Sequence, residues 1–341
     1  MKWNRKRVLV TGGASFIGSH LAEDLVRKGA TVVVADDLSS GKRVNLSLVA
    51  DQIELSVGDL KTPSFLKNAM KNIDVVFHLA AVHGGRGFIA THPADCSLNM
   101  VLDGMVFDAA SKSGVDKVCF ASSACVYPKT LQTKENAGLL LREEMADAFV
   151  EGRAFADEEY GWAKLMGEMS LRAFHVQHGM KGVSCRIFTS YGPRENETHA
   201  IIALIAKAFA QIDPYEIWGT GNQDRNFTFV SDTVEGLIRA TERINDASAI
   251  NLGTSEHIKI KEVAQAIFDL TDFHPRQVRF DASKPEGVHS RASDNEMCRR
   301  LLDWEPRTKL DEGLRTTVDW YFSTKKRGDV KKHIANLLFQ R

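Results

Sequence analysis

The chain lacks net charge, because 44 lysines and arginines balance 44 aspartates and glutamates. Proteins that bind nucleic acid or a membrane surface usually carry an excess of basic residues, so we expect neither partner. No apolar run approaches the roughly 20 residues that a transmembrane helix needs. The basic cluster before Val8 leads into a short apolar stretch that ends at Val10, so no secretory signal is predicted.

Cysteine is scarce and shows no paired spacing. The five cysteines include no CxxC motif, and they are Cys96, Cys119, Cys125, Cys185 and Cys298. An odd number without such spacing argues against a disulfide framework and against a zinc site, so we expect no metal. A reducing, cytoplasmic location fits this pattern best.

Short β-branched runs alternate with helical patterns over roughly the first half of the chain. The runs expected to form strands are Val8–Val10, Val32–Val34, Val75–Leu79, Val118–Ala121 and Val183–Ile187. This alternation predicts an α/β fold with a doubly wound parallel sheet of the Rossmann type, covered by helices on both faces. The looser pattern after Pro193 predicts a smaller α/β lobe at the carboxyl side of the sheet.

A glycine-rich segment, Thr11 to Gly18, lies between the first strand and the first helix. Helix N-terminal amides at such a turn hold a pyrophosphate. Asp36 ends the next strand, 18 residues after Gly18. A carboxylate there accepts a hydrogen bond from a ribose 2′-hydroxyl and repels a 2′-phosphate, so NAD is favoured over NADP. Ser15 replaces the middle glycine of a GxxGxxG pattern, and its hydroxyl offers a hydrogen-bond donor instead.

A second motif, YxxxK, places Tyr160 and Lys164 four residues apart, on one face of a helix. An adjacent ammonium and a nicotinamide cation both favour the phenolate of a tyrosine whose ordinary pKa is about 10. Ser123 follows a predicted strand, where the carboxyl ends of parallel strands face a ligand. The order of glycine-rich turn, serine and YxxxK predicts a redox centre that removes a hydride and a hydroxyl proton from substrate.

Longer runs of residues add to these motifs and resemble a known family over most of the chain, from Val8 to about Tyr321. They are His83–Ile89, Ser122–Pro128, Trp218–Phe229 and 285–291, the last reading PEGVHSR. On these residues the chain resembles the NAD-dependent sugar-nucleotide epimerases of the extended short-chain dehydrogenase/reductase superfamily, and among them the GDP-mannose 3,5-epimerases.

The resemblance implies a transient oxidation at C4 of a hexose, which acidifies the protons at C3 and C5. Inverting either carbon needs one acid/base group on each face of the ring. Cys125 matches the cysteine that serves the family in this role. The family's lysine finds its nearest equivalent in His199, a match that requires a short gap. A histidine, with an ordinary pKa near 6.5, exchanges protons near neutrality with little adjustment.

The motifs and the resemblance together define the expected site. The catalytic residues are Tyr160, Lys164, Ser123, Cys125 and His199. The NAD-binding residues are Gly12, Ser15, Phe16, Ile17, Gly18, Asp36, Asp59, Leu60, Ala80, Tyr160 and Lys164. The residues expected to bind a nucleotide sugar, with a GDP-sugar favoured, are Gly85, Ser123, Cys125, Lys207, Arg225 and Arg291. Thr189 departs from the family, which has asparagine there, so sugar contacts are expected to differ.

We expect residues 1–187 with 228–254 to form the NAD-binding Rossmann domain, and residues 188–227 with 255–341 the sugar-nucleotide lobe. A homodimer is expected through the helices that begin near Asn99 and Tyr160. The apolar contacts expected there involve Ala109, Ala110, Met166, Met169 and Leu171, although some of these residues are expected to face the sheet instead.

Two other functions remain open from the sequence. A simple C4 epimerase of a nucleotide sugar needs the redox centre but no acid/base pair for C3 and C5. A non-catalytic NAD-responsive scaffold needs only the fold, because a fold alone does not establish activity.

Overall fold

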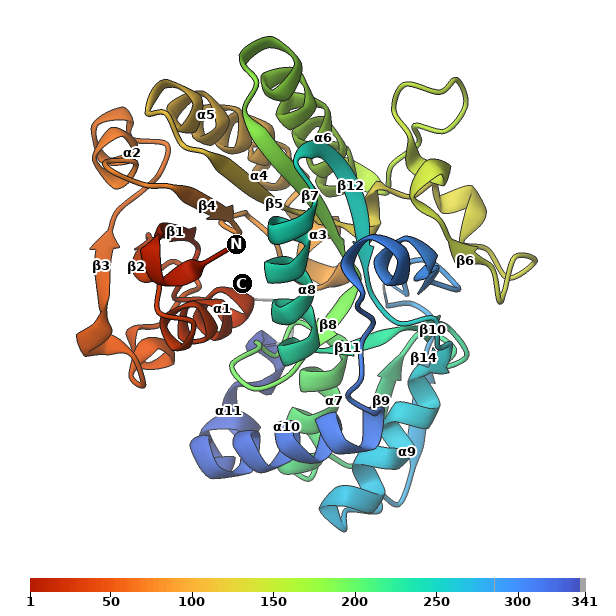
Figure 1. Cartoon of the computed structure of the whole chain (residues 1–341). Coiled ribbons are helices and arrows are strands. Elements are labelled where there is room, and N and C mark those ends of the chain that lie inside the picture. Colours follow the sequence, from red (N-terminus) through yellow and green to blue (C-terminus); the bar gives the residue numbers. More distant parts are fainter. Residues whose placement is uncertain (285, 338–341) are drawn as a thin grey trace.

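The computed structural model describes residues 1–284 and 286–337. At its centre is a seven-stranded sheet, all parallel, in the order β12-β7-β5-β4-β1-β2-β3 (Figure 1). Its strands are β1 (Arg7–Thr11), β2 (Thr31–Asp36), β3 (Ile53–Val57), β4 (Val75–His78), β5 (Lys117–Ser123), β7 (Lys181–Ile187) and β12 (Asp246–Leu252). The strand order reverses between β1 and β4, as in a doubly wound Rossmann sheet, so the predicted fold class is confirmed.

The apolar runs form strands because both faces of the sheet are buried. In β1, Val8 and Val10 point into one core while Leu9 points into the other. Side chains alternate between faces along a strand, so a strand buried on both sides reads as a continuous apolar run. All five predicted runs lie in this sheet.

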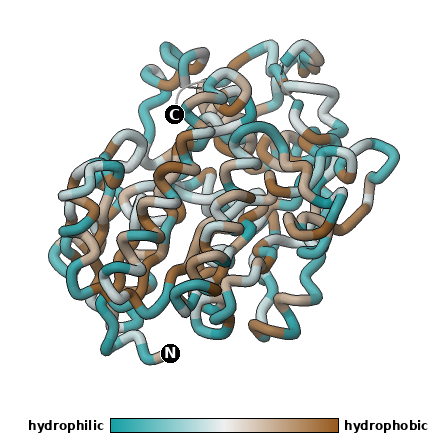
Figure 2. Tube along the Cα trace, turned by 90° about the horizontal axis from the view of Figure 1, so that it is seen from above, coloured by the Kyte–Doolittle hydropathy of each residue, from teal (hydrophilic) through white to brown (hydrophobic). Residues whose placement is uncertain are grey.

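Helices cover both faces of the sheet. On one face lie α1 (Phe16–Arg27) and α8 (Val230–Arg243), and on the other α2 (Pro63–Ala69), α5 (Asn99–Lys112) and α6 (Glu158–His178). Two short helices connect β4 to α5, and they are α3 (Arg86–Thr91) and α4 (Pro93–Ser97). Figure 2 shows hydrophobic residues concentrated between these layers and hydrophilic residues along the outer loops.

A second, smaller core lies beyond the carboxyl ends of the strands, where it forms one wall of the site described below (Figure 1). Its helices are α7 (Ala200–Phe209), α9 (Ile260–Thr271), α10 (Leu310–Thr324) and α11 (Arg327–Leu337). Short strands pair around it as β8 (Thr189–Tyr191) with β11 (Phe227–Phe229), β9 (Tyr215–Trp218) with β14 (Val278–Asp281), and β10 (Asp224–Arg225) with β13 (Ile258–Lys259). A further pair joins β6 (Leu140–Leu141) to β15 (Ala292–Ser293). Within the described ranges, no helix combines the length and apolarity that crossing a bilayer requires.

A buried ion pair fastens α6 to the sheet. Arg186, on β7, donates from Nε and Nη2 to the two carboxylate oxygens of Glu168, on α6, at 2.9 and 2.8 Å. The same guanidinium donates to the hydroxyl of Tyr127 and to the backbone carbonyls of Glu143 and Ala146. Arg186 therefore holds both the helix and the long segment between β5 and α6.

Replacing Arg186 with Met should lower the free energy of unfolding by about 3–5 kcal/mol, because it leaves the Glu168 carboxylate buried without its partner. Lys181→Met on the same strand is the matched control. It removes an exposed ion pair with Asp116 and should cost less than about 1 kcal/mol. Urea unfolding of the two variants measures the difference, and equal losses would contradict this role for Arg186.

Candidate active site

The glycine-rich segment forms a tight turn between β1 and α1. Gly12 has a φ of +66°, and a Cβ added there would lie 2.9 Å from the backbone nitrogen of Ala80. A Cβ on Gly18 would overlap the Gly12 carbonyl oxygen. Ser15 donates its hydroxyl to that same carbonyl at 2.6 Å. The hydroxyl is thus engaged within the turn, which corrects the expectation that it offers a donor to a ligand.

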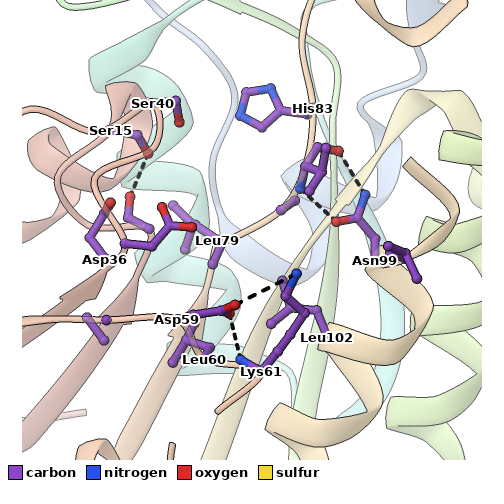
Figure 3. A pocket seen from close by; sticks show the side chains of 18 residues that line it. Ser15, Asp36, Ser40, Asp59, Leu60, Lys61, Leu79, His83, Asn99 and Leu102 are labelled. Carbon is purple, nitrogen blue, oxygen red and sulfur yellow. Dashed lines mark hydrogen bonds and ion pairs between the residues drawn. The ribbon is translucent and has the colours of Figure 1, made fainter. Parts of the chain in front are cut away.

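A cavity opens above this turn, and we call it the turn cavity (Figure 3). Of the expected cofactor residues, those that line it are Gly12, Ser15, Asp36, Asp59, Leu60 and Ala80. Phe16 and Ile17 pack instead against the core under α1, and Gly18 lies inside the turn. These three residues form the first turn of α1, where the backbone amides have no partner within the helix.

Three acidic residues lie at one end of the turn cavity, and they are Asp36, Asp37 and Asp59. Asp36 ends β2 and is 5% exposed; its two oxygens accept from the backbone amides of Ala14 and Leu38 at 2.9 and 2.8 Å. Asp59 accepts from the amide of Lys61 at 2.8 Å. A carboxylate has about four acceptor positions, so Asp36 retains capacity for a ribose hydroxyl. Acidic groups at this end also suit an unphosphorylated ribose.

Asn99 lies on the opposite wall of the turn cavity and was missed by the sequence analysis (Figure 3). Its side chain both accepts from the amide and donates to the carbonyl of Val82, at 2.7 and 2.8 Å. This fully buried amide fixes the loop after β4 against the start of α5. An asparagine at a helix start gives no sequence signal that would distinguish this role.

The predicted redox residues meet where the end of β5 approaches the beginning of α6: Ser123 ends β5, and Tyr160 and Lys164 lie on α6. None of the three lines the turn cavity. The Lys164 ammonium lies 5.9 Å from the centre of the Tyr160 ring and 4.7 Å from that of Phe120. Burial lowers the pKa of Lys164, and the charge of Asp103 opposes this shift. Burial, followed by the charges of Cys125, Asp103 and Cys96, raises the pKa of Tyr160 above its usual value. A hydrogen bond with Ser123 offsets only part of this rise. A positive charge close to the phenol would favour its ionisation.

Cys125 lies just beyond Ser123, in a 3-10 turn (Ala124–Val126). The Ser123 hydroxyl accepts from the Cys125 amide at 3.1 Å, which stabilises this turn. The Cys125 thiol points into a second cavity, which we call the lobe cavity because α7 and the strands of the smaller core line it. A guanidinium nitrogen of Arg291 lies 3.5 Å from the sulfur.

His199 immediately precedes α7 and also lines the lobe cavity. Its Nδ1 lies 2.8 Å from a carboxylate oxygen of Glu195, a residue that is 4% exposed. Burial alone would lower the pKa of His199, but the charge and hydrogen bond of Glu195 raise it above the usual value. The structure therefore places a thiol and an imidazole on one cavity.

Three guanidinium groups converge at the lobe cavity. Arg86 and Arg291 donate to the same oxygen of Asp157, at 2.6 and 3.2 Å. Burial would raise the pKa of Asp157, but these two guanidinium groups hold it well below its usual range. Burial, followed by the charges of Arg291 and Arg86, lowers the pKa of Arg225 to about 9. The sequence analysis missed Arg86 and Asp157, whose proximity arises only from the fold.

The remaining expected substrate residues also line the lobe cavity, with the exception of Ser123. The Gly85 amide donates to the Thr198 hydroxyl at 3.2 Å, and a Cβ on Gly85 would overlap the Thr198 carbonyl oxygen. Lys207 donates to the backbone carbonyl of Glu216 at 2.7 Å, and burial lowers its pKa to about 8.

Comparison with known proteins agrees with this arrangement. A sequence model described as the NAD dependent epimerase/dehydratase family matches residues 8–253. The chain belongs to this family. As a member, it is an NAD-dependent enzyme, and the residues around the turn cavity fit such a dinucleotide.

Among its relatives, GDP-mannose 3,5-epimerase 1 of Oryza sativa subsp. indica is 32% identical over 92% of this chain and 81% of its own length. Two solved structures are also similar. The UDP-glucose 4-epimerase of Thermotoga maritima has a TM-score of 0.83 at 26% identity, covering 93% of this chain and 99% of that one. An epimerase from Methanothermobacter thermautotrophicus has a TM-score of 0.83 at 30% identity, and the match covers 97% of this chain and 95% of that one.

Replacing Asp36 with Ala should weaken NAD binding roughly 10- to 150-fold, the loss expected for hydrogen bonds to a charged group worth about 1.5–3 kcal/mol. Asp108→Ala is the matched control. The Asp108 carboxylate lies outside the lining of both cavities, in an exposed ion pair with Lys112. Calorimetric titration with NAD and NADP measures both affinities. An unchanged affinity in Asp36→Ala, or a preference of the unmodified protein for NADP, would reject this assignment.

Proposed function

We propose that the protein epimerises a nucleoside-diphosphate hexose, GDP-mannose or a related GDP-sugar, at C3, C5 or both. Bound NAD supplies a reversible oxidation at C4 of the sugar. The observation that carries the proposal is that Cys125 and His199 line one cavity. Cys125 also lies beside Ser123 and Tyr160. An enzyme that inverts only C4 has no use for such a pair of acid/base groups.

The chain's own residues supply the proton transfers. Tyr160 takes the C4 hydroxyl proton, Ser123 hydrogen-bonds with its phenol, and the Lys164 ammonium favours the phenolate. The C4 ketone makes the adjacent carbons acidic. Cys125 and His199 then exchange a proton with such a carbon, one removing it and the other returning it on the opposite face.

The charges of the lobe cavity support a diphosphate ligand. Arg86 pairs with the carboxylates of Asp157 and Glu158, and Arg291 shares the Asp157 carboxylate. Arg225 donates to two backbone carbonyls. A Cβ added to Gly287 would lie within 3.3 Å of both Arg86 and Arg225. Guanidinium groups gathered at one point repel each other, and a diphosphate would relieve that repulsion through bidentate hydrogen bonds.

The likeness to GDP-mannose 3,5-epimerase 1 supports a guanine base. We propose that residues 1–187 with 228–254 bind NAD, and that residues 188–227 with 255–341 bind the nucleotide sugar. Pro285 and residues 338–341, which belong to the second set, lie outside the described residues.

A second candidate is a C4 epimerase that acts on a UDP-sugar. The observation in its favour is the structural similarity to the UDP-glucose 4-epimerase of Thermotoga maritima. Such an enzyme returns its own hydride to C4 and leaves the neighbouring C–H bonds intact.

Solvent deuterium separates the two candidates. With GDP-mannose in D₂O, we expect the protein to incorporate deuterium at C3, C5 or both, as read by proton NMR. UDP-glucose and UDP-N-acetylglucosamine serve as the comparison substrates. Inversion at C4 of a UDP-sugar without any gain of deuterium would reject the proposal and establish the second candidate.

Replacing Tyr160 with Phe should abolish both reduced-nicotinamide absorbance and deuterium incorporation, because the C4 ketone never forms. Replacing Cys125 with Ser should retain the absorbance change while epimerised product falls by about 10²–10⁴-fold, since the thiol acts only after oxidation. Cys298→Ser is the control for Cys125, because Cys298 is buried in the sheet core. If Cys125→Ser lost the absorbance change to the same extent as the epimerised product, Cys125 would be needed before the ketone forms, which would contradict this role.

We also propose that the protein is a homodimer formed through α5 and α6. Apolar side chains at the start of α5 and on α6, each at least 40% exposed, support this, and they are Leu98, Met100, Val101, Trp162 and Met166. Of the residues named from the sequence, Ala110 and Leu171 are the ones that face the sheet, where both are fully buried. Ala109 also packs partly on that core.

Sedimentation velocity at micromolar concentration should show a dimer, and Met166→Glu should shift it towards monomer, because a charge in an apolar interface is costly to desolvate. Val44→Glu is the control, since Val44 is 69% exposed but lies outside both helices. A monomeric unmodified protein would reject the dimer.

A further inference from the structure

We propose that Glu195 and His199 act as one proton-exchanging pair, in which Glu195 is the positioning residue and His199 Nε2 is the atom that meets the sugar. This inference rests on the proposed function for its chemistry. The pairing itself rests on geometry alone and can be tested without substrate.

The hydrogen bond between the two side chains leaves one imidazole nitrogen for a ligand. Nδ1 of His199 lies 2.8 Å from Oε1 of Glu195, so the second ring nitrogen points away from the carboxylate. Among the described residues, both Nε2 of His199 and Oε2 of Glu195 are buried and have no hydrogen-bond partner. Both residues line the lobe cavity, as does Cys125. A buried polar atom without a partner is rare enough in a folded protein to need an explanation, and a ligand would supply one.

The loop that carries the pair is fastened to the helix behind the glycine-rich turn. His20, on α1, contacts the Pro193 carbonyl at 3.0 Å. Burial lowers the pKa of His20 to about 4, so its neutral ring donates this bond. Arg194 has a φ of +74°, and its guanidinium donates to Ser19 and Glu23 on α1, at 3.2 and 2.6 Å. The loop is therefore held against the same helix whose N-terminus forms the turn cavity.

The other end of the loop is fastened to the smaller core. Glu197 accepts from the Tyr321 hydroxyl and from the Lys325 ammonium, each at 2.9 Å. The Thr198 hydroxyl accepts from the Gly85 amide at 3.2 Å. With both ends fixed, the imidazole position is set by the fold and by Glu195, and does not depend on a mobile side chain.

Three other ionisable side chains lie on the segments around His199. His83, from the loop after β4, approaches the His199 ring edge to face at 6.0 Å. On α7 the Lys207 ammonium is bonded to a backbone carbonyl. Glu197 of the same loop is neutralised by Lys325. The Glu195 carboxylate thus has the strongest charge interaction with the imidazole.

The remaining ionisable groups of the lobe cavity lie on other elements and have partners of their own. Arg86 pairs with Asp157 and Glu158, and Arg291 also pairs with Asp157. Arg225 donates to two backbone carbonyls, and the Glu286 carboxylate accepts from the Thr220 hydroxyl. Tyr191, on β8, stays neutral, because burial raises its pKa.

The hydrogen bond between His199 and Glu195 determines which atom takes and which atom gives a proton when a carbon is inverted. Nδ1–H donates to Glu195, so Nε2 of the neutral ring carries the lone pair. Nε2 takes the proton next to the C4 ketone, and the electron pair of the broken C–H bond becomes the enolate. The Cys125 thiol gives its proton to the opposite face of that carbon and becomes a thiolate. One proton has moved from sulfur to Nε2, and exchange with solvent restores both groups.

The first test needs no variant and no substrate. Long-range ¹H–¹⁵N NMR of the unmodified protein, with the His199 signals identified by their loss in His199→Ala, should show the Nδ1–H tautomer. Isolated histidines titrate near pKa 6.5, and His199 should titrate above that value. An Nε2–H tautomer, or a pKa at or below 6.5, would overturn the pairing.

The second test removes the charge and keeps the shape. Glu195→Gln should lower the pKa of His199, because the charge that raises it is gone, whereas Glu195→Asp should keep the pKa above its usual value. Glu197→Gln is the matched control, a buried carboxylate of the same loop bonded to other partners. If Glu197→Gln lowers the pKa of His199 as much as Glu195→Gln does, the effect is structural and the positioning role is wrong.

The third measurement links the pair to the reaction. In D₂O with GDP-mannose, Glu195→Gln should lose about 10- to 100-fold in deuterium incorporation at one carbon, with the reduced-nicotinamide absorbance retained. If no nucleotide sugar gives exchange with the unmodified protein, the proposed function fails while the NMR result stands. If exchange occurs in the unmodified protein and is unchanged in Glu195→Gln, the positioning role fails while the proposed function stands.

Discussion

One buried carboxylate, that of Asp157, joins parts of the active site that come from distant stretches of the chain. It accepts from Arg86 and Arg291, and its backbone amide donates to the Cys125 carbonyl at 2.8 Å. It directly precedes α6, which carries Tyr160. Removing a carboxylate from water is costly, and two guanidinium groups offset that cost here. These bonds therefore fix α6 relative to the turn that carries Cys125, and fix both relative to the segment that carries Arg291.

This arrangement separates two kinds of chemistry. The turn cavity has acidic groups and backbone amides, which suit a dinucleotide with a free ribose. The lobe cavity has a thiol, an imidazole and an excess of guanidinium groups, which suit a sugar joined to a diphosphate. Tyr160 packs on the small cluster of Phe88, Ile89 and Cys96. Because Ile89 also lines the lobe cavity, the phenol lies close to that cavity.

The sequence predicted the elements whose signal is local. Strands buried on both faces, such as β1, read as continuous apolar runs, and Asp36 follows from its place at a strand end. The edge strands β3 and β12 were missed because polar and small residues such as Glu54 and Asn251 interrupt their apolar pattern. The Arg86–Asp157 pair could not be predicted, since its partners are 71 residues apart and meet only through tertiary packing.

The central claim is that one catalytic cycle combines a hydride that returns to its own carbon with a proton exchanged with solvent. GDP-mannose carrying deuterium at C4, incubated with the protein in ordinary water beside a parallel reaction of unlabelled substrate in D₂O, tests both halves by NMR. We predict that the C4 label is retained in the epimerised product and that solvent deuterium appears at C3, C5 or both. Loss of the C4 label, or epimerisation without solvent deuterium at either carbon, would contradict the account.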